Sequence, residues 1–155
     1  MSEIYTDGSA IPNPGLGGYA VIKNSQPIAL GREEKSTNIR MEAFALINAY
    51  KLATDGDVIL TDSEFWVNVV TKWAPAWERN GWKKKTGPIK NLELVQELYA
   101  GYKAHPGIRL TWTRGHVGTL GNEMADFWAN RAREGITMDT VGAVNLPDNL
   151  KEGQE

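Results

Sequence analysis

The strongest constraint on the fold of this chain is a short run near its middle, Val58-Ile59-Leu60, which is continuously apolar. A run without alternation of apolar and polar residues is typical of a central strand that is covered on both faces. Strands of this kind occur in α/β folds, where helices pack on the sheet. Asp62 follows the run almost directly, at the carboxyl end where such sheets place their ligands.

The periodicity before this run predicts three antiparallel strands. They are expected at Glu3 to Thr6, Gly17 to Lys23 and Pro27 to Glu34, with Asn24-Ser25-Gln26 as a hairpin turn. A helix follows, for which Asn38 can serve as the cap.

The rest of the chain is mostly helical in pattern. The first helix carries apolar residues at helical spacing up to Tyr50, and Gly56 stops the chain just after it. Further helices are expected at 64–73, at 92–104 and from about Leu120 to Glu134, with a strand at Ile108 to Thr113. This order predicts an α/β fold, a five-stranded mixed sheet with helices packed on both faces.

Length and composition narrow the class of protein. The chain has 155 residues, which fits one domain with a single core. It has no cysteine, which excludes disulfides and thiolate chemistry and is compatible with a reducing compartment. No apolar run approaches the roughly 18 residues of a membrane span, and the sequence begins without a signal peptide. We therefore expect a cytoplasmic protein without a membrane partner.

The net charge of -2 conceals two regions of opposite sign. Between Glu78 and Lys90 there are five cations and one anion, whereas Asp139 to Glu155 holds four anions and one cation. We interpret residues 139–155 as an acidic, weakly ordered C-terminal extension, and the basic segment as a patch that the total charge hides.

Four acidic residues stand where a carboxylate is locally out of place: Asp7, Glu42, Asp62 and Asp126. They lie in a strand-like run, on the apolar side of a helix, just past a buried strand and inside the last helix. Carboxylates that converge only after folding indicate a metal site. An oxygen-only ligand set, in a chain with 2 His and no Cys, favours Mg²⁺ or Mn²⁺ over zinc or copper. Pairs of such ions hydrolyse phosphodiesters.

Most of these carboxylates also have a purely structural interpretation. Asp7-Gly8-Ser9 could form a turn, and Asp62-Ser63 could cap the next helix. Asp126 shares a helical stripe with Asn122 and Asn130, which alone would indicate a solvated face. Glu42 is harder to explain in this way, because a carboxylate that borders a buried face needs a partner.

The sequence around the four carboxylates resembles type 1 ribonuclease H, the bacterial ribonuclease HI family, over roughly residues 3 to 145. Five motifs in register carry the resemblance: Thr6-Asp7-Gly8-Ser9, Asn13-Pro14-Gly15 with Gly17-Gly18, Thr37-Asn38-Ile39-Arg40-Met41-Glu42, Thr61-Asp62-Ser63, and Gly115-His116-Val117-Gly118 leading to Gly121-Asn122-Glu123-Met124-Ala125-Asp126. The resemblance implies a ribonuclease H-like fold, with residues 1–138 as the catalytic domain.

The resemblance implies an endoribonuclease that cleaves the RNA strand of RNA/DNA hybrids, as a monomer and with 5′-phosphate and 3′-hydroxyl products. Asp7, Glu42, Asp62 and Asp126 would hold two Mg²⁺ ions, for which Mn²⁺ could substitute, and the site should be weakly formed without metal. His116 would assist proton transfer or product departure, although on the sequence alone it could be a plain loop residue. We interpret His105 as structural.

Substrate recognition is expected away from the metals, at the 2′-hydroxyls of the hybrid minor groove. Asn13 and Asn38 match family positions that touch this groove, and amides both give and accept hydrogen bonds. Ile39 stands where the family usually has Asn, and Glu64 where Gln is common. These departures predict a lower substrate affinity than in close relatives.

The segment from Trp73 to Asn91 resembles the basic protrusion with which the family grips the DNA strand. Cations interleaved with aromatic rings suit a strand whose phosphates are neutralised while a sugar or base packs on a ring. The matching residues are Trp77, Trp82, Lys83, Lys84, Lys85 and Asn91, the last of which would form a phosphate pocket with Thr37 and Arg40. Ala76 replaces a frequent amide, which weakens this pocket. The alternative is that the tryptophans pack helices together and the lysines are only solvated, an interpretation that we prefer for Trp73.

Two other functions are compatible with parts of the sequence. DNA-cleaving resolvases and transposases have related folds, but they lack the combination of the His116 loop and the basic protrusion. A non-catalytic hybrid-binding module is opposed by the four carboxylates, because clustered negative charge does not favour binding of a nucleic acid.

Overall fold

The computed structural model describes residues 1–114 and 119–154, and its centre is a five-stranded mixed sheet in the order β3-β2-β1-β4-β5. The strands are β1 (Glu3–Ile11), β2 (Gly15–Lys23), β3 (Gln26–Ser36), β4 (Val58–Thr61) and β5 (Arg109–Trp112). The first three pair antiparallel as consecutive hairpins, whereas β4 runs parallel to both β1 and β5. All four residues of β4 are buried, as the continuous apolar run predicts.

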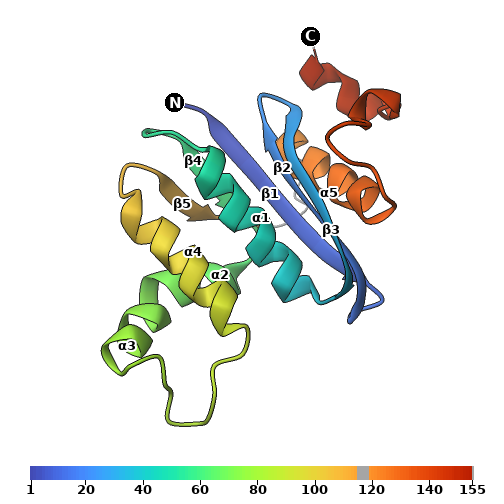
Figure 1. The fold of residues 1–155 in the computed structure, drawn as a ribbon. Coiled ribbons are helices and arrows are strands. Elements are labelled where there is room, and N and C mark those ends of the chain that lie inside the picture. Colours follow the sequence, from blue (N-terminus) through green and yellow to red (C-terminus); the bar gives the residue numbers. More distant parts are fainter. Residues whose placement is uncertain (115–118, 155) are drawn as a thin grey trace.

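Helices cover both faces of this sheet, which confirms the predicted α/β architecture (Figure 1). They are α1 (Asn38–Leu52), α2 (Glu64–Asn68), α3 (Ala74–Arg79), α4 (Leu92–Ala104) and α5 (Leu120–Arg133). α1 and α4 build one hydrophobic cluster with the sheet, and α5 builds a second cluster on the opposite face. Side chains of β1 alternate between the two, since Ile4 belongs to the first cluster and Tyr5 to the second.

The first strand is longer than the sequence pattern predicts. β1 continues past Thr6 to Ile11, and Asp7, Gly8 and Ser9 pair with three residues of β2. The interpretation of Asp7-Gly8-Ser9 as a turn is therefore wrong. Pairing with β2 overrides the local turn preference of an Asp-Gly pair.

Two local boundaries also differ from those expected. The hairpin turn between β2 and β3 has two residues, Asn24 and Ser25, both with positive φ (53° and 62°), because Gln26 already pairs with Lys23. The N-cap of α1 is Thr37 rather than Asn38. The hydroxyl of Thr37 accepts a hydrogen bond from Arg40 N at 3.1 Å, and Asn38 begins the helix.

The predicted helix at 64–73 is divided. α2 ends at Asn68 and a π-helical turn, Val69–Trp73, leads into α3. Pro75 lies in the first turn of α3, a position where the fixed φ of proline suits a helix. The segment turns away from the sheet and forms, with the α3–α4 connection, the lower end of the molecule in Figure 1.

The C-terminal extension contacts α5. Leu150 is 3% exposed and lies in the second cluster, and Val141, Val144 and Leu146 also pack against that cluster. The division of the chain at residue 138 stays a prediction. Among the described residues, no helix combines the length and apolarity that crossing a bilayer requires.

Candidate active site

The four carboxylates predicted from the sequence come together around one cavity, of about 240 Å³, which we call the acidic cavity. Each comes from a different element: Asp7 from β1, Glu42 from α1, Asp62 from the end of β4 and Asp126 from α5. Gly8, Ser9 and Asn38 complete the lining, so no cation is among the lining residues that the structure describes.

Close backbone approach places Glu42 beside Asp7. A Cβ on Gly8 would lie 2.7 Å from the backbone nitrogen of Glu42 and would also collide with the carbonyl of Met41. Only glycine allows α1 to lie so close to β1 at this point. Gly8 N donates a hydrogen bond to Oδ1 of Asp7 at 2.9 Å, which orients that carboxylate.

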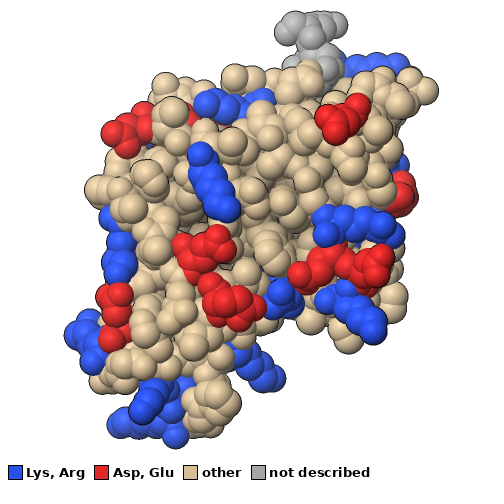
Figure 2. Space-filling model, in the orientation of Figure 1, with Lys and Arg blue, Asp and Glu red and all other residues tan. Residues whose placement is uncertain are grey.

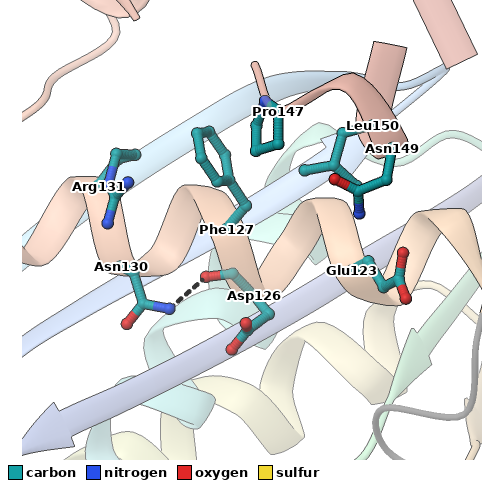
Figure 3. Close-up of a pocket in the computed structure, with 8 residues that line it drawn as sticks. All are labelled: Glu123, Asp126, Phe127, Asn130, Arg131, Pro147, Asn149 and Leu150. Carbon is teal, nitrogen blue, oxygen red and sulfur yellow. Dashed lines mark hydrogen bonds between the residues drawn. The ribbon is translucent and has the colours of Figure 1, made fainter. Parts of the chain in front are cut away.

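A second glycine sets the position of α5 on the other face. A Cβ on Gly18 in β2 would lie 2.5 Å from the backbone nitrogen of Arg133. With α5 held this close to the sheet, Asp126 reaches the acidic cavity. Asp126 also borders a hollow of about 390 Å³ between α5 and the C-terminal extension, where its backbone oxygen accepts a hydrogen bond from Asn130 Nδ2 at 3.0 Å (Figure 3).

The cap of α2 is Ser63, not Asp62. Ser63 Oγ accepts a hydrogen bond from Trp66 N at 3.3 Å, so Ser63 caps the helix and the Asp62 side chain does not. The backbone oxygen of Asp62 accepts from Trp112 Nε1 at 3.1 Å, which fixes the junction between β4 and α2 to β5. The Asp62 side chain lines the acidic cavity.

The electrostatics of the acidic cavity are unbalanced. Burial raises the pKa of Asp7 well above its usual value, and the charges of Asp62, Asp126 and Glu42 raise it further. Burial, followed by the charge of Asp62, raises the pKa of Glu42 to about 7. A bound cation would relieve both effects, and a set of carboxylate oxygens suits a hard divalent ion such as Mg²⁺. Among the described residues, no group of three or more potential ligands is close enough to hold a metal ion in this arrangement. The four carboxylates around the acidic cavity are nevertheless the type of ligand that such an ion needs.

The two asparagines expected at the minor groove are linked at the rim of this cavity. Asn38 N donates to Oδ1 of Asn13 at 3.1 Å, and Oδ1 of Asn38 accepts from Ala10 N at 2.8 Å. Both amide oxygens therefore bind backbone N–H groups, whereas neither amino group has a hydrogen-bond partner among the described residues, so each can donate to a ligand. Asn38 lines the acidic cavity directly.

Beside the acidic cavity lies a second one of about 430 Å³, the aromatic groove. Its lining residues are Ile39, Phe65, Trp66, Val69, Trp73, Trp77, Lys84, Ile89, Lys90, Asn91 and Val95. Trp73, which the sequence favours as a packing residue, contacts Phe65 and Trp77 but keeps 40% of its surface exposed. Phe65, 41% exposed, was not anticipated, although a large aromatic residue three positions after Asp62 was an available signal.

The other residues of the basic segment differ in their positions. Lys83, Lys84 and Lys85 are exposed on the α3–α4 connection, and Figure 2 shows cations gathered at that end of the molecule. Trp82 does not line the groove. It packs edge-on against Tyr99 of α4 with ring centroids 6.2 Å apart, and its contact with substrate stays a prediction.

The residues expected to form a phosphate pocket are adjacent. Arg40 Nη1 donates to Oδ1 of Asn91 at 3.0 Å, and Thr37 is one turn from Arg40 at the start of α1. Two carboxylates, from Glu33 and Glu93, also bind the Arg40 guanidinium, which the sequence does not predict. His116 lies outside the described residues, so its place relative to the carboxylates stays a prediction.

Comparison with known proteins gives a consistent result. The family model for RNase H matches residues 1–134. A ribonuclease H from Methylorubrum extorquens is 40% identical over 151 residues, covering 93% of this chain and 66% of that protein. A ribonuclease H from Dichelobacter nodosus is 38% identical over 144 residues, covering 89% of this chain and 95% of the relative.

Solved structures show the same fold. A crystal structure of LC9-RNase H1, described as a type 1 RNase H with the type 2 active-site motif, has a TM-score of 0.75 and 25% identity, covering 99% of this chain and 84% of that chain. The foamy viral protease-reverse transcriptase in complex with RNA/DNA hybrid has a TM-score of 0.72 at 20% identity, covering 87% of this chain and 20% of the viral one.

Proposed function

Because this chain belongs to the ribonuclease H family and hydrolyses the RNA strand of RNA/DNA hybrids, we propose that Asp7, Glu42, Asp62 and Asp126 hold two Mg²⁺ ions for this reaction. The observation that carries the proposal is the acidic cavity, which all four carboxylates line from four different elements. When bound, a pair of such ions activates water and stabilises the leaving oxygen of a phosphodiester. Mn²⁺, with the same preference for oxygen ligands, would replace Mg²⁺.

The protein contributes a rigid and negatively charged frame. Asp7 lies on β1 where the strand pairs with β2, and the close contact at Gly8 fixes the distance between β1 and α1. The pKa of Asp7 is raised and that of Glu42 is raised to about 7, so binding of a cation to Glu42 releases protons near neutral pH. Cleavage then leaves a 5′-phosphate and a 3′-hydroxyl.

His116 is proposed to assist proton transfer or product departure. The proposal rests on its position between Gly115 and Gly118 in the motif before α5, and on the imidazole group, which changes charge near neutral pH. His105 ends α4 and is exposed, on a loop at the opposite end of β5 from Asp62, so we assign it no role in the reaction.

The hybrid would be recognised on both strands. Asn13 and Asn38, with their amino groups as donors, are proposed to contact the 2′-hydroxyls of the RNA strand in the minor groove. The aromatic groove would take the DNA strand. An apolar wall would leave the 2′-hydroxyl of a ribose without a hydrogen bond, and deoxyribose has no such hydroxyl. Thr37, Arg40 and Asn91 would bind a phosphate of this strand.

The exposed lysines would add affinity without sequence preference. Lys83, Lys84 and Lys85 neutralise phosphates, and Trp77 provides a ring for a sugar or base. Trp82 would support the protrusion through Tyr99 and contact the strand at its edge. We further propose that the protein is cytoplasmic and acts as a monomer; the absence of cysteine is compatible with a reducing compartment.

One assay tests the proposal. Purified protein is incubated with end-labelled RNA/DNA hybrid, duplex DNA and duplex RNA, each with Mg²⁺, with Mn²⁺ and with EDTA. We expect cleavage of the RNA strand in the hybrid alone, only with a divalent ion, and with 5′-phosphate ends. Cleavage of duplex DNA would favour a resolvase-like nuclease, and tight binding of the hybrid without cleavage would favour a binding module.

A further inference from the structure

Arg40, the cation of the proposed phosphate pocket, is held by two carboxylates in the free protein. Its Nε and Nη2 donate to the two carboxylate oxygens of Glu33 at 3.0 and 3.3 Å. Its Nη1 donates to Oε1 of Glu93 at 2.9 Å and to Oδ1 of Asn91 at 3.0 Å. This Arg40 cluster of one cation and two anions has a net negative charge, so it would repel a phosphate as it stands.

The two carboxylates are bound to Arg40 in different ways. Glu33 makes a two-pronged contact from β3, and 30% of its side chain is exposed. Glu93 makes a single contact from the first turn of α4, and 66% of its side chain is exposed. Glu93 is therefore the partner that can move into solvent, while Glu33 keeps the guanidinium oriented.

The Glu93 carboxylate is positioned as an anionic ligand would be. In the first turn of α4, it takes a charge-assisted hydrogen bond from Arg40. The amide oxygen of Asn91, the residue before α4, accepts a hydrogen bond from the same guanidinium nitrogen. A phosphate oxygen in the place of the Glu93 carboxylate would take its hydrogen bond from Arg40 Nη1.

We infer that the Glu93 carboxylate occupies the position of a DNA-strand phosphate in the free protein, and that the hybrid displaces it to reach Arg40. The inference rests on the proposed function of this pocket, and it identifies Glu93 as a competitor of the phosphate for Arg40. Glu93 thereby limits the affinity for the hybrid and its dependence on salt. Binding exchanges one ion pair for another, and fewer counterions are released than if Arg40 were open.

The test compares Glu93→Gln with Glu97→Gln. Glu97 lies one turn further along α4, is exposed and contacts Lys51 at 3.8 Å, so its substitution removes the same charge from the same helix away from Arg40. The dissociation constant of a fluorescently labelled RNA/DNA hybrid is measured by anisotropy in EDTA, over a range of salt concentrations. Each variant is also made with Arg40→Ala, after circular dichroism has shown that Arg40→Ala is folded.

We expect Glu93→Gln to bind the hybrid about two- to fivefold more tightly than Glu97→Gln, the range that an exposed ion pair supplies. Its plot of log K against log salt should be steeper by up to about one unit. Both differences should vanish with Arg40→Ala. Equal affinities of the two Gln variants, or weaker binding by Glu93→Gln, would overturn the inference while leaving hybrid cleavage intact. A wild-type protein that does not bind the hybrid would refute the proposed function itself.

Discussion

The acidic cavity and the aromatic groove are neighbours built partly from the same elements, yet they are opposite in character. The first turn of α1 gives Asn38 to the cavity and Ile39 to the groove, and the segment after β4 gives Asp62 to the cavity and Phe65 to the groove. The cavity gathers partly buried carboxylates on elements anchored to the sheet. The groove gathers the exposed rings of Phe65 on α2 and Trp73 on the π-helical turn, together with lysines on the connection to α4.

This difference assigns different tasks to the two regions. Burial and neighbouring like charges raise the pKa of Asp7 and of Glu42 and create a strong demand for cations, which suits the chemical step. Exposed rings and lysines give affinity that tolerates sequence changes and weakens with salt. Substitutions in the cavity should therefore reduce kcat, whereas substitutions in the groove and the basic segment should raise KM.

The largest expected effect comes from the cavity. Asp62→Asn keeps the shape of the side chain and removes its charge, so kcat with Mg²⁺ should fall by at least about 10³-fold. Binding of the hybrid should be unchanged or slightly tighter, because one repulsive charge is lost. Single-turnover cleavage and anisotropy measure the two quantities. Asp139→Asn on the exposed C-terminal extension is the matched control, and substantial turnover by Asp62→Asn would break the division of tasks.

The next effect concerns His116, which we place with the chemistry. His116→Ala should lose about 10² to 10³ in kcat, as is typical of general acid/base assistance, while its KM stays similar. The pH-rate profile should lose a feature near the ordinary imidazole pKa of about 6.5. The exposed His105, replaced by Ala, provides the control. A wild-type kcat for His116→Ala at saturating hybrid would make His116 a loop residue.

A smaller effect is expected on the basic segment. Reversing Lys83, Lys84 and Lys85 to Glu should raise KM at low salt by about tenfold or more and flatten its salt dependence, because phosphate contacts are lost. The value of kcat should hardly change. Steady-state kinetics at several salt concentrations provide the measurement, with Lys151→Glu as a remote charge reversal. An unchanged KM at low salt would show that the three lysines are only solvated.

The smallest effect concerns the stability of the cavity without metal. The pKa of Glu42 is raised to about 7 in the folded protein, from an ordinary value of 4.5, so the folded state holds an extra proton between these pH values. The free energy of unfolding should therefore fall as pH rises through this window. Asp57, whose pKa is lowered by hydrogen bonds from Thr54 and Ser2, acts only at lower pH.

Thermal unfolding in EDTA tests this expectation. Between pH 5 and pH 7.5 the wild-type Tm should fall by several degrees more than that of Glu42→Gln, on the scale of about 2–4 °C per kcal/mol for a chain of this size. Mg²⁺ should stabilise the wild type more at pH 7.5 than at pH 5. If the Tm of both proteins changed equally with pH, the surroundings of Glu42 would not raise its pKa.

The sequence predicts the architecture because the relevant signals are local. The continuous apolar run of β4 and the helical spacing in α1 depend on neighbours within a few residues. The extension of β1 to Ile11 is different, since it depends on pairing with β2 rather than on the residues of β1. A local pattern cannot separate an Asp-Gly turn from an Asp-Gly pair inside a strand.

The same distinction applies to the site. Asp7, Glu42, Asp62 and Asp126 are predictable because each is out of place in its own segment, and the cavity confirms only that they converge. The partners of Arg40 are not predictable in this way. Glu33 and Glu93 are exposed-looking acids on β3 and α4, 7 and 53 residues away, and only the folded arrangement brings them to one guanidinium.

The most direct test of the account is calorimetric titration of Mg²⁺ into the wild-type protein and into Asp62→Asn, in buffers that differ in ionisation enthalpy. The account predicts binding to the wild type with release of protons, more at pH 6 than at pH 8.5, because Glu42 must deprotonate. Asp62→Asn should bind much more weakly. Equal binding by both proteins, or binding whose heat is independent of the buffer at pH 6, would contradict the claim that these carboxylates hold the ions.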